Sequence, residues 1–422
     1  MEQIDTLIIG GGQAGLVMSH ALSKRGREHS ILERGRIAER WRSERWDGLH
    51  FQTPNLLVGL PDYPLAHDNP NGFASAARIA EFLTEYARFI SAPVRHGVAV
   101  TRLARDGGAG QYLLETSAGP MISNNVIVAT GPFQRPVIPP MLPRDAAVMQ
   151  LHAAEYRSPG KLPDGAVLVI GAGASGAQIA EELMRAGRKV FLSVSRHRRT
   201  PRRYRGHDHV WWWVETGMDK TPPERRNPDH APVVHTGAYG GHTIDFRDYA
   251  NQGMTLLGRA EAATREAMTF AADLADNLAH GDAAYLAFLD FVDAHIVRKR
   301  MRLKEDPAAR MIMPTPAAMH RPIRRLDFRT ADIGTVIWAT GYDLDFDWID
   351  IPVLDQRGAP VHEKGVTRFP GLYFLGLNFL SKLSSSFLIG VAKDAERVAE
   401  SVCAMSGQAQ SNVAAEGVLD QG

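Results

Sequence analysis

Two glycine-rich segments constrain this chain more than any other feature of its sequence. Residues 10–15 read Gly-Gly-Gly-Gln-Ala-Gly and follow the apolar run 6–9, and residues 171–176 read Gly-Ala-Gly-Ala-Ser-Gly and follow the apolar run 167–170. Each segment lies between a buried-strand pattern and a helical pattern. In that context the glycines allow a tight turn and a close approach of the backbone to a pyrophosphate at the helix N-terminus. The sequence therefore predicts two dinucleotide-binding units rather than two ordinary glycine-rich turns.

The residue at the end of the next strand differs between the two units. At the same offset from the first glycine, the first unit has Glu33 and the second has Val194. A carboxylate accepts both ribose hydroxyls of an adenosine and repels a 2′-phosphate, so we expect FAD or NAD at the first site. Ser195 and Arg196 offer hydroxyl and guanidinium donors that suit a 2′-phosphate, so we expect NADPH at the second. Because the basic run continues past Arg199, a solvated basic turn is the alternative explanation for these arginines.

The overall composition excludes several classes of protein. The chain has 422 residues, of which 44% are hydrophobic and 23% charged, which are ordinary globular values with room for two or three domains. Its formal net charge of +1 gives no argument for nucleic-acid binding. The chain runs from residue 1 straight into the first strand pattern, and the longest apolar stretch, residues 374–392, is interrupted by Lys382 and four serines. We therefore expect a cytoplasmic protein with neither signal peptide nor transmembrane segment, and we leave open whether it forms a homo-oligomer.

Cys403 is the single cysteine of the chain. One cysteine excludes an internal disulfide and a Cys-x-x-Cys redox pair. A flavin in this chain therefore passes its electrons to something other than a dithiol of the same chain. The amphipathic pattern around Cys403 predicts a buried core thiol on a C-terminal helix.

A second internal repeat supports the two-unit organisation. Residues 126–131 and 336–341 are both apolar strand patterns that end in Ala-Thr-Gly. Small residues at a strand end let the chain pass close to a cofactor or to another segment. The Pro-rich stretches 136–143 and 158–164 predict a hinge into the second unit, and the loop 306–322 is expected to return the chain to the first.

The predicted fold class is α/β, with two Rossmann-like dinucleotide-binding domains and the NADPH domain inserted into the FAD domain. The FAD domain is expected to contain residues 1–145 and 323–405. The NADPH domain is expected to contain residues 146–322, including a substrate-shaping insertion at about 197–305. Residues 406–422 are small and polar and are expected to form a disordered tail.

Hydrophobic periodicity predicts several helices. The pattern over residues 78–90 has helical spacing, and residues 260–278 and 283–299 predict a helical pair. A further helix is expected to begin near the serines 384–386. Its positive end would stabilise negative charge on a reduced flavin by about 0.3–1 kcal/mol.

Several further segments resemble the signature motifs of one enzyme family, the class B flavoprotein monooxygenases. The chain is most similar to bacterial flavin-containing monooxygenases and to their plant auxin-forming relatives, over about residues 4–404. The similar segments are residues 41–48 (family pattern W-x-x-R-[YW]-x-G), 152–157 (H-x-x-x-Y-[KR]), 339–342 (Ala-Thr-Gly-Tyr), and the closing strand 371–376 with the flavin-proximal helix 391–395.

Three positions depart from the family pattern. Residues 147–151 lack the F-x-G that normally opens the 152–157 motif. Tyr156 and Arg157 replace the Trp followed by Pro or Asp of Baeyer–Villiger relatives, which argues against ketone-to-ester chemistry. Gln52 stands where the family has an active-site asparagine, with Asn55 three residues further on.

The resemblance implies an NADPH- and dioxygen-dependent FAD monooxygenase. Such an enzyme oxygenates a small nitrogen- or sulfur-containing substrate through a flavin C4a-hydroperoxide. One alternative is an NAD(P)H:acceptor oxidoreductase that passes electrons to a quinone or carrier without oxygenation, and Gln52 leaves this alternative open. Another is a non-catalytic flavin redox sensor, which would need only one of the two fingerprints.

The fingerprints and the resemblance together assign candidate site residues. The expected FAD contacts are Gly10, Gly12, Gly15, Glu33, Arg34, Arg40, Trp41, His50, Val98, Ala129, Thr130, Gly131, Gly376 and Leu388. The expected NADPH contacts are Gly171, Gly173, Ser175, Gly176, Ser195, Arg196, Arg199, Ala339, Thr340 and Gly341. The expected catalytic contacts near the flavin ring are Gln52, Asn55 and Arg45.

Two conspicuous segments receive no firm functional role. The His-Asp-His at 207–209 has no second cluster to complete a metal site, so no metal is expected. The three tryptophans at 211–213 are expected either to wall an aromatic substrate pocket or to pack a domain edge.

Overall fold

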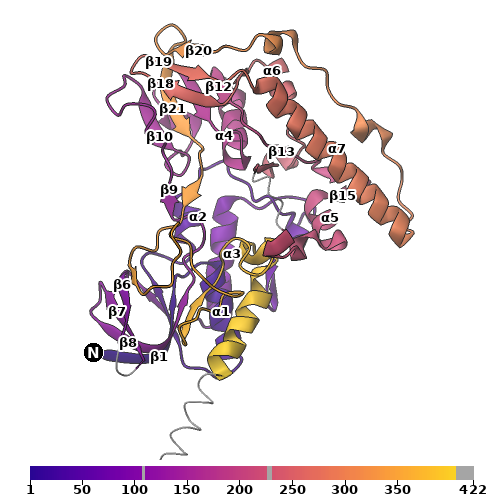
Figure 1. Cartoon of the computed structure of the whole chain (residues 1–422). Coiled ribbons are helices and arrows are strands. Elements are labelled where there is room, and N and C mark those ends of the chain that lie inside the picture. The colour runs from indigo at the N-terminus through magenta and orange to yellow at the C-terminus, as the bar shows by residue number, and fades with distance from the viewer. Residues whose placement is uncertain (107–109, 226–230, 405–422) are drawn as a thin grey trace, which may run out of the picture.

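Two main sheets divide the chain into two units: a mixed sheet that contains the strand before the first glycine fingerprint, and a parallel sheet that contains the strand before the second (Figure 1). The computed structural model describes residues 1–106, 110–225 and 231–404. Both units combine parallel strands with flanking helices, which confirms the α/β class. The second unit is inserted into the first, as expected.

The first unit is built on an eight-stranded sheet in the order β23-β6-β7-β8-β1-β2-β5, with β24 beside β8. Its strands are β1 (Glu2–Ile9), β2 (Ser30–Glu33), β5 (Val94–His96), β6 (Val100–Arg105), β7 (Tyr112–Thr116), β8 (Met121–Val128), β23 (Ile349–Asp350) and β24 (Leu372–Phe374). Strand β1 pairs in parallel with β2 and β8, and β24 pairs in parallel with β8. The C-terminal part of the chain therefore completes the sheet that the N-terminus begins.

Helices α1 (Gln13–Ser23), α2 (Glu39–Ser43) and α3 (Ala76–Phe89) belong to this unit. The helix predicted at residues 78–90 is confirmed as α3, which begins where the Ser75 hydroxyl accepts a hydrogen bond from the Arg78 amide at 3.2 Å. Its buried face joins the core of the first unit through Ile79, Phe82 and Leu83.

The prediction of a helix beginning at the serines 384–386 is wrong. Those serines lie in a 3-10 turn, η8 (Leu383–Ser386), and the described part of the C-terminal helix covers residues 391–404. The extended backbone of Phe387 (φ −95°, ψ 155°) ends the turn and prevents it from continuing into the helix.

The second unit is built on a five-stranded parallel sheet in the order β10-β21-β11-β12-β17. Its strands are β10 (Met149–His152), β11 (Ala166–Ile170), β12 (Val190–Ser193), β17 (Thr255–Leu257) and β21 (Ile333–Trp338). Helix α4 (Ala174–Arg185) follows the second fingerprint, and helix α6 (Phe246–Asn251) precedes β17. A three-stranded antiparallel sheet of β18 (Ala260–Ala263), β19 (Ala267–Phe270) and β20 (Arg325–Asp327) adjoins it.

The predicted helical pair at 260–278 and 283–299 is wrong, because its first member is mostly the β18–β19 hairpin. The Thr264 hydroxyl accepts the amide of Ala267 at 3.2 Å, which stabilises the turn between the strands. A single helix, α7 (Leu274–Lys299), follows. Gly281 does not interrupt it; a Cβ there would lie 2.5 Å from His197 Nε2, so this glycine allows close packing.

The chain returns to the first unit later than expected. The predicted boundary at residue 323 is wrong, because β20 and β21 still pair inside the second unit. Parallel pairing with both β10 and β11 buries β21 on both sides. The two crossings between the units are β9 (Arg135–Pro136) and β22 (Tyr342–Asp343), which pair with each other in antiparallel fashion.

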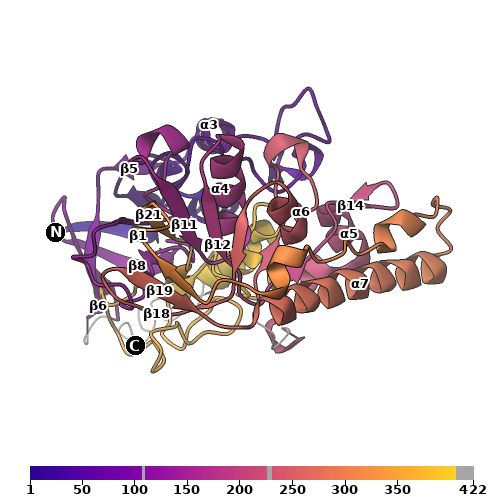
Figure 2. The ribbon, with the colours of Figure 1, turned by 90° about the horizontal axis from the view of Figure 1, so that it is seen from above.

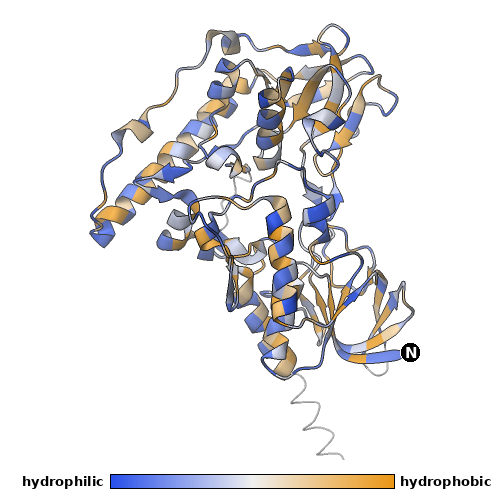
Figure 3. Ribbon diagram, turned by 180° about the vertical axis from the view of Figure 1, so that it is seen from behind, coloured by the Kyte–Doolittle hydropathy of each residue, from blue (hydrophilic) through white to orange (hydrophobic). Residues whose placement is uncertain are grey.

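Helix α5 (His209–Thr216) packs against α7 in a separate hydrophobic cluster that contains Trp212, Tyr285 and Leu289. The view from above shows α7 running along one side of the molecule (Figure 2). Hydropathy colouring shows mainly hydrophobic central strands and helices with alternating hydrophobic and hydrophilic positions (Figure 3). Within the described ranges, no helix is both long and apolar enough to cross a membrane.

The remaining elements are short. The strands are β3 (Gly59–Leu60), β4 (Tyr63–Pro64), β13 (Arg198–Arg199), β14 (Arg203–Tyr204), β15 (His207–Asp208) and β16 (Val233–Val234). The other 3-10 turns are η1 (Asn55–Leu57), η2 (Pro159–Lys161), η3 (Met218–Lys220), η4 (Pro223–Arg225), η5 (Ala238–Gly240), η6 (Pro307–Arg310) and η7 (Ala317–His320). The expected tail at 406–422 lies outside the described residues.

Candidate functional site

A cavity of about 1030 Å³ lies between the two units, and its wall contains both glycine fingerprints. Gly10 and Gly12 line it from the first unit, and Gly171 and Gly173 line it from the second. The fingerprints follow the carboxyl ends of β1 and β11, which is where open α/β sheets bind ligands. The loop at residues 44–53 lines the same cavity.

The glycines that open and close each fingerprint are required by the backbone. These are Gly10 and Gly15 in the first fingerprint and Gly171 and Gly176 in the second. Gly10 and Gly171 have φ of +113° and +102°, a region that side chains rarely adopt. A Cβ at Gly15 would clash with the Gly10 carbonyl oxygen, and one at Gly176 would clash with that of Gly171. These contacts hold each helix close to its strand. A Cβ on Gly12, in contrast, has no atom within 4 Å, so that position faces open space.

The helices that follow the fingerprints begin without a side-chain cap. The N-cap residues are Gly12 for α1 and Gly173 for α4, and neither helix receives a side-chain hydrogen bond there. The first amides and the positive end of each helix dipole therefore remain available to an anion. Helix α5 differs, because the Asp208 carboxylate accepts the Val210 amide at 2.8 Å.

Glu33 lies at the end of β2 and lines the cavity. Its Oε2 accepts the Gly11 amide at 2.6 Å and its Oε1 accepts the Gly35 amide at 2.8 Å. These bonds fix the carboxylate beside the first fingerprint. Ser195 lines the cavity just beyond β12, beside the second fingerprint. Glu33 and Ser195 therefore both line the cavity, each beside its own fingerprint.

Most of the predicted site residues line this one cavity. From the FAD set these are Gly10, Gly12, Glu33, Arg34, Arg40, Trp41, His50, Val98, Ala129, Thr130, Gly131, Gly376 and Leu388. From the NADPH set they are Gly171, Gly173, Ser175, Ser195, Ala339, Thr340 and Gly341, and from the catalytic set Gln52 and Arg45.

Gly15, Gly176, Asn55, Arg196 and Arg199 do not line the cavity. The two glycines pack inside their own turns, as described above. The Asn55 amide donates to the Asn69 carbonyl at 2.9 Å, which directs it away from the cavity. Arg196 and Arg199 were both predicted to contact NADPH, and they lie in different environments.

Arg199 is buried and forms ion pairs with Asp245 and Asp282, and its guanidinium lies 4.2 Å from the Tyr285 ring centroid. The two carboxylates already neutralise the charge of this buried guanidinium, which leaves it poorly suited to a 2′-phosphate. Arg196, in contrast, is exposed, and its Nη2 lies 3.4 Å from His280 Nδ1. Of the two arginines, only Arg196 projects from the surface next to the cavity-lining Ser195.

The crossing strands and His152 tie the two units together. The His152 Nδ1 accepts the Ala154 amide at 3.1 Å, so Nε2 carries the proton and donates to the Gly341 carbonyl at 3.0 Å. Burial lowers the pKa of His152, which keeps the ring neutral. Both ring nitrogens form hydrogen bonds to backbone groups. His152 therefore positions the crossing between the two units and is not available to transfer protons.

Several cavity-lining residues were missed or left undecided by the sequence, and four of them have side chains suited to ligand contact. Gln178, His235 and Phe387 carry no motif, although the position of Gln178 in the early turns of α4 was a usable signal. The tryptophans at 211–213 were predicted either to wall a pocket or to pack a domain edge. Trp213 lines the cavity, so it belongs to a pocket wall. Trp212 is fully buried and packs between the helices.

The remaining sequence features have structural roles. In the part of the chain that the structure describes, no group of three or more His, Cys, Asp or Glu side chains is arranged to hold a metal. Asp208 caps α5 and pairs with Arg202. Cys403 is half-buried, rather than fully buried as predicted.

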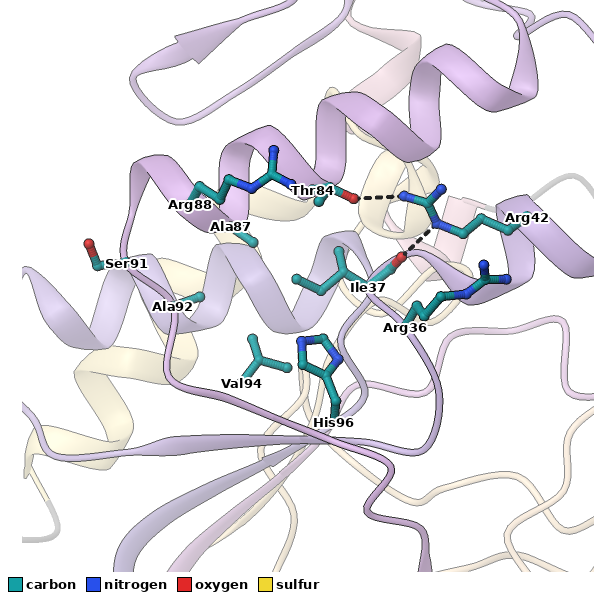
Figure 4. A pocket seen from close by; sticks show the side chains of 10 residues that line it. All are labelled: Arg36, Ile37, Arg42, Thr84, Ala87, Arg88, Ser91, Ala92, Val94 and His96. Carbon is teal, nitrogen blue, oxygen red and sulfur yellow. Dashed lines mark hydrogen bonds between the residues drawn. The ribbon is translucent and has the colours of Figure 1, made fainter.

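A second, smaller pocket lies on the surface of the first unit and shares no lining residue with the cavity (Figure 4). Its volume is about 570 Å³. Arg36, Arg88 and His96 contribute basic groups, and Arg42 donates to the Thr84 hydroxyl at 2.9 Å across it. None of the site residues predicted from the sequence lines this pocket.

Two glycine-rich fingerprints line one cavity, and the helix after each begins without a side-chain cap. This arrangement is typical of oxidoreductases that bind two dinucleotides. Residues 7–224 match the pyridine nucleotide-disulphide oxidoreductase family, and the chain belongs to this family. The chain is 32% identical over 397 residues to a Geobacillus kaustophilus protein named "Uncharacterized oxidoreductase CzcO-like", covering 93% of this chain and 96% of the relative.

Two further comparisons concern flavin enzymes. The structure of a flavin-containing monooxygenase from Stenotrophomonas maltophilia superposes with a TM-score of 0.64 at 19% identity, covering 96% of this chain and 99% of that chain. The rice protein named indole-3-pyruvate monooxygenase YUCCA1 is 29% identical over 192 residues, 44% of this chain and 47% of the relative. The expected resemblance to flavin monooxygenases is therefore confirmed, and the fold is theirs.

Proposed function

We propose that the protein is an NADPH- and dioxygen-dependent FAD monooxygenase that oxygenates a small nitrogen- or sulfur-containing substrate. The observation that carries this proposal is the single cavity whose wall contains both fingerprints and the loop between Arg45 and Gln52. The reaction consumes substrate, dioxygen, NADPH and a proton, and it releases oxygenated substrate, water and NADP⁺. Bound FAD supplies the chemistry by accepting a hydride from NADPH and activating dioxygen.

The residues present fit both dinucleotides. The amides after Gly12 and Gly173 offer hydrogen bonds to a pyrophosphate, and the open space beside Gly12 leaves room for it. The Glu33 carboxylate suits an adenosine ribose without a 2′-phosphate. Ser195 and the exposed Arg196 suit the 2′-phosphate of NADPH.

The protein's contribution near the reacting atoms is positioning and exclusion of water. Trp41 packs edge-on against Phe51 at a centroid distance of 5.6 Å, and both line the cavity. The Gln52 backbone is fixed, because its carbonyl accepts Arg202 Nη1 at 3.0 Å. We propose that the Gln52 side chain offers its amide where the family has an asparagine. Arg45 lies over the Trp41 ring at 5.8 Å and extends this wall.

The second candidate function is an NAD(P)H:acceptor oxidoreductase, which Gln52 in place of the family's asparagine leaves open. The lone Cys403 gives this alternative no dithiol to use, so its acceptor would be a quinone or carrier. Anaerobic reduction of the purified protein with NADPH, followed by rapid mixing with dioxygen, tests both functions. The proposal predicts delayed flavin reoxidation and oxygenated product from an amine or sulfide. Immediate reoxidation with stoichiometric hydrogen peroxide, with and without substrate, would favour the alternative.

A further inference from the structure

The surface pocket of the first unit has a basic wall without a carboxylate (Figure 4). Of the 10 residues that line it, three are arginines and one is a histidine, and none is Asp or Glu. Its volume of about 570 Å³ is in the range of sites for small organic ligands. A hollow lined by charges of one sign concentrates ligands of the opposite sign. The pocket therefore favours an anion.

The Arg42 guanidinium is held at this pocket by neutral groups alone. Its Nε donates to the Ile37 carbonyl at 3.3 Å, and its Nη2 donates to the Ala80 carbonyl at 3.3 Å and to the Thr84 hydroxyl at 2.9 Å. These acceptors orient the group but leave its positive charge without a carboxylate partner. Among the described residues, the hydrogens of Arg42 Nη1 form no hydrogen bond, so they are available to a bound anion.

Arg88 brings a second uncompensated charge to the same pocket. It lies one helical turn after Thr84 on α3, so both side chains extend from one face of that helix. Figure 4 shows the Arg88 guanidinium reaching toward Thr84, with Arg42 on the other side of Thr84. Arg88 is exposed, and in the part of the chain that the structure describes its guanidinium forms neither an ion pair nor a hydrogen bond.

Apolar side chains make up much of the remaining wall. Ile37 and Ala87 are buried residues of the first unit's hydrophobic core, and Ala92 and Val94 line the pocket beside them. The pocket thus combines two cationic groups with an apolar surface. An apolar group bound there is removed from water, which stabilises the complex.

The pocket lies against a segment that also lines the dinucleotide cavity. Residues 36, 37 and 42 line the pocket, whereas residues 33, 34 and 38–41 line the cavity. The His96 Nδ1 donates to the Gly35 carbonyl at 3.2 Å, which fastens this segment to β5. Arg36 differs from the other two arginines, because its Nε and Nη2 donate to the carboxylate of the cavity-lining Glu39 at 2.8 Å and 2.9 Å. A ligand in the pocket would therefore contact the segment that supplies the expected flavin contacts.

We propose that this pocket is a second ligand site, which binds a small organic anion through a phosphate or carboxylate group. The Arg42 and Arg88 guanidinium groups would form charge-assisted hydrogen bonds to the oxyanion, and no lining carboxylate opposes it. The apolar part of the ligand would pack against Ala92 and Val94. The site is independent of the oxygenation chemistry, because it shares no lining residue with the dinucleotide cavity.

Titration calorimetry on the full chain tests the ligand class, with FAD bound and NADP⁺ saturating so that the phosphate-binding turns of the cavity are occupied. The probes are phenyl phosphate, benzoate, inorganic phosphate and benzyl alcohol. We expect at least one of the two aromatic anions to bind, and the tighter of the two identifies the preferred oxyanion. Inorganic phosphate and benzyl alcohol each lack one half of the ligand and should bind at least about fivefold more weakly than that anion. Binding of benzyl alcohol as tight as that of both aromatic anions overturns the proposal, as does no binding of either anion.

Matched variants locate the binding. Arg88→Ala and Arg42→Gln should each weaken the tighter aromatic anion about fivefold or more and leave benzyl alcohol unchanged. The control is Arg78→Ala, because Arg78 lies on the same helix as Arg88 but pairs with Glu85 at 3.1 Å and does not line the pocket. Circular dichroism of each variant checks that the fold is retained. Unchanged affinity in a folded Arg88→Ala variant, or an equal loss in Arg78→Ala, overturns the proposal.

Discussion

The Tyr156 hydroxyl donates to Glu182 Oε2 at 3.2 Å, which holds the 152–157 motif against helix α4. Glu182 also lies against the other motif: a Cβ on Gly48 would be 2.5 Å from Glu182 Oε1. The 41–48 segment belongs to the first unit and α4 to the second. Glu182 therefore lies where the two sequence motifs and the two units meet, and the absence of a side chain at Gly48 leaves room for its carboxylate.

This junction predicts a pH-dependent stability. Burial, with a smaller contribution from the charge of Asp47 and against the opposing effect of the Tyr156 hydrogen bond, raises the pKa of Glu182 from 4.5 to about 7. The folded protein thus binds this proton more tightly than the unfolded chain. The free energy of unfolding should fall as pH rises from about 4.5 to about 7, while below that window the carboxyl is protonated in both states and has no effect.

Replacing the carboxyl with an amide isolates this effect. Glu182→Gln should be stabilised relative to the natural protein at pH 8, and this difference should shrink toward pH 5. Thermal unfolding of both proteins at the two pH values measures it, with the exposed Glu28→Gln as the control. A difference in melting temperature that stays constant with pH would show that Glu182 is not the titrating group.

Substitutions at Gly12 and Gly15 of the first fingerprint should affect different properties, flavin binding at Gly12 and folding stability at Gly15. A side chain at Gly12 enters open space, so Gly12→Val should fold normally but purify without the yellow colour of bound flavin. A side chain at Gly15 clashes with the Gly10 carbonyl, so Gly15→Ala should lower the free energy of unfolding by more than about 3 kcal/mol. Flavin absorbance and chemical denaturation distinguish the two results. Stoichiometric FAD in a folded Gly12→Val variant would refute the first-site assignment.

Arg196 should govern the choice between NADPH and NADH. Charge-assisted contacts to phosphate are worth about 1.5–3 kcal/mol, so Arg196→Ala should raise the KM for NADPH more than about tenfold and leave that for NADH little changed. Arg203→Ala is the matched control, because Arg203 belongs to the same basic run, is exposed, and does not line the cavity. Equal increases for both nucleotides would remove the 2′-phosphate role from Arg196.

The sequence predicted those parts of the fold that local spacing determines. Each fingerprint brings its turn, helix start and strand end within one short segment, so Gly10, Glu33, Gly171 and Ser195 could be placed at the cavity from spacing alone. The signals for helix α3 were equally local, because its hydrophobic periodicity directly follows its N-cap residue in the sequence.

Long-range pairing determined what the sequence could not predict. Nothing near β21 indicates that it inserts between β10 and β11, so the return to the first unit was placed too early. The apolar residues of β19 were predicted to be helical, because the pairing that makes them a strand is not visible in the local sequence. Strand β19 pairs with β18 and with β20, and β20 lies more than fifty residues away. His235 reaches the cavity only because the insertion folds back over α4, and a lone histidine gives no sequence signal of that.

Gln52 and Asn55 were both candidate catalytic contacts, and the structure favours Gln52. Gln52 lines the cavity, whereas the Asn55 amide is bonded to Asn69. If the Gln52 amide supports oxygen transfer, Gln52→Leu should lower the ratio of oxygenated product to NADPH consumed by about tenfold or more, with a matching rise in hydrogen peroxide. Flavin reduction by NADPH under anaerobic conditions should change little.

Two companion variants make this prediction specific. Gln52→Asn retains an amide and should restore much of the product yield, whereas Asn55→Leu should leave the yield unchanged, because Asn55 does not line the cavity. Product and peroxide are quantified together against NADPH consumption. A loss of yield in Asn55→Leu but not in Gln52→Leu would reverse the assignment, and it would require the η1 turn to move toward the cavity when substrate binds.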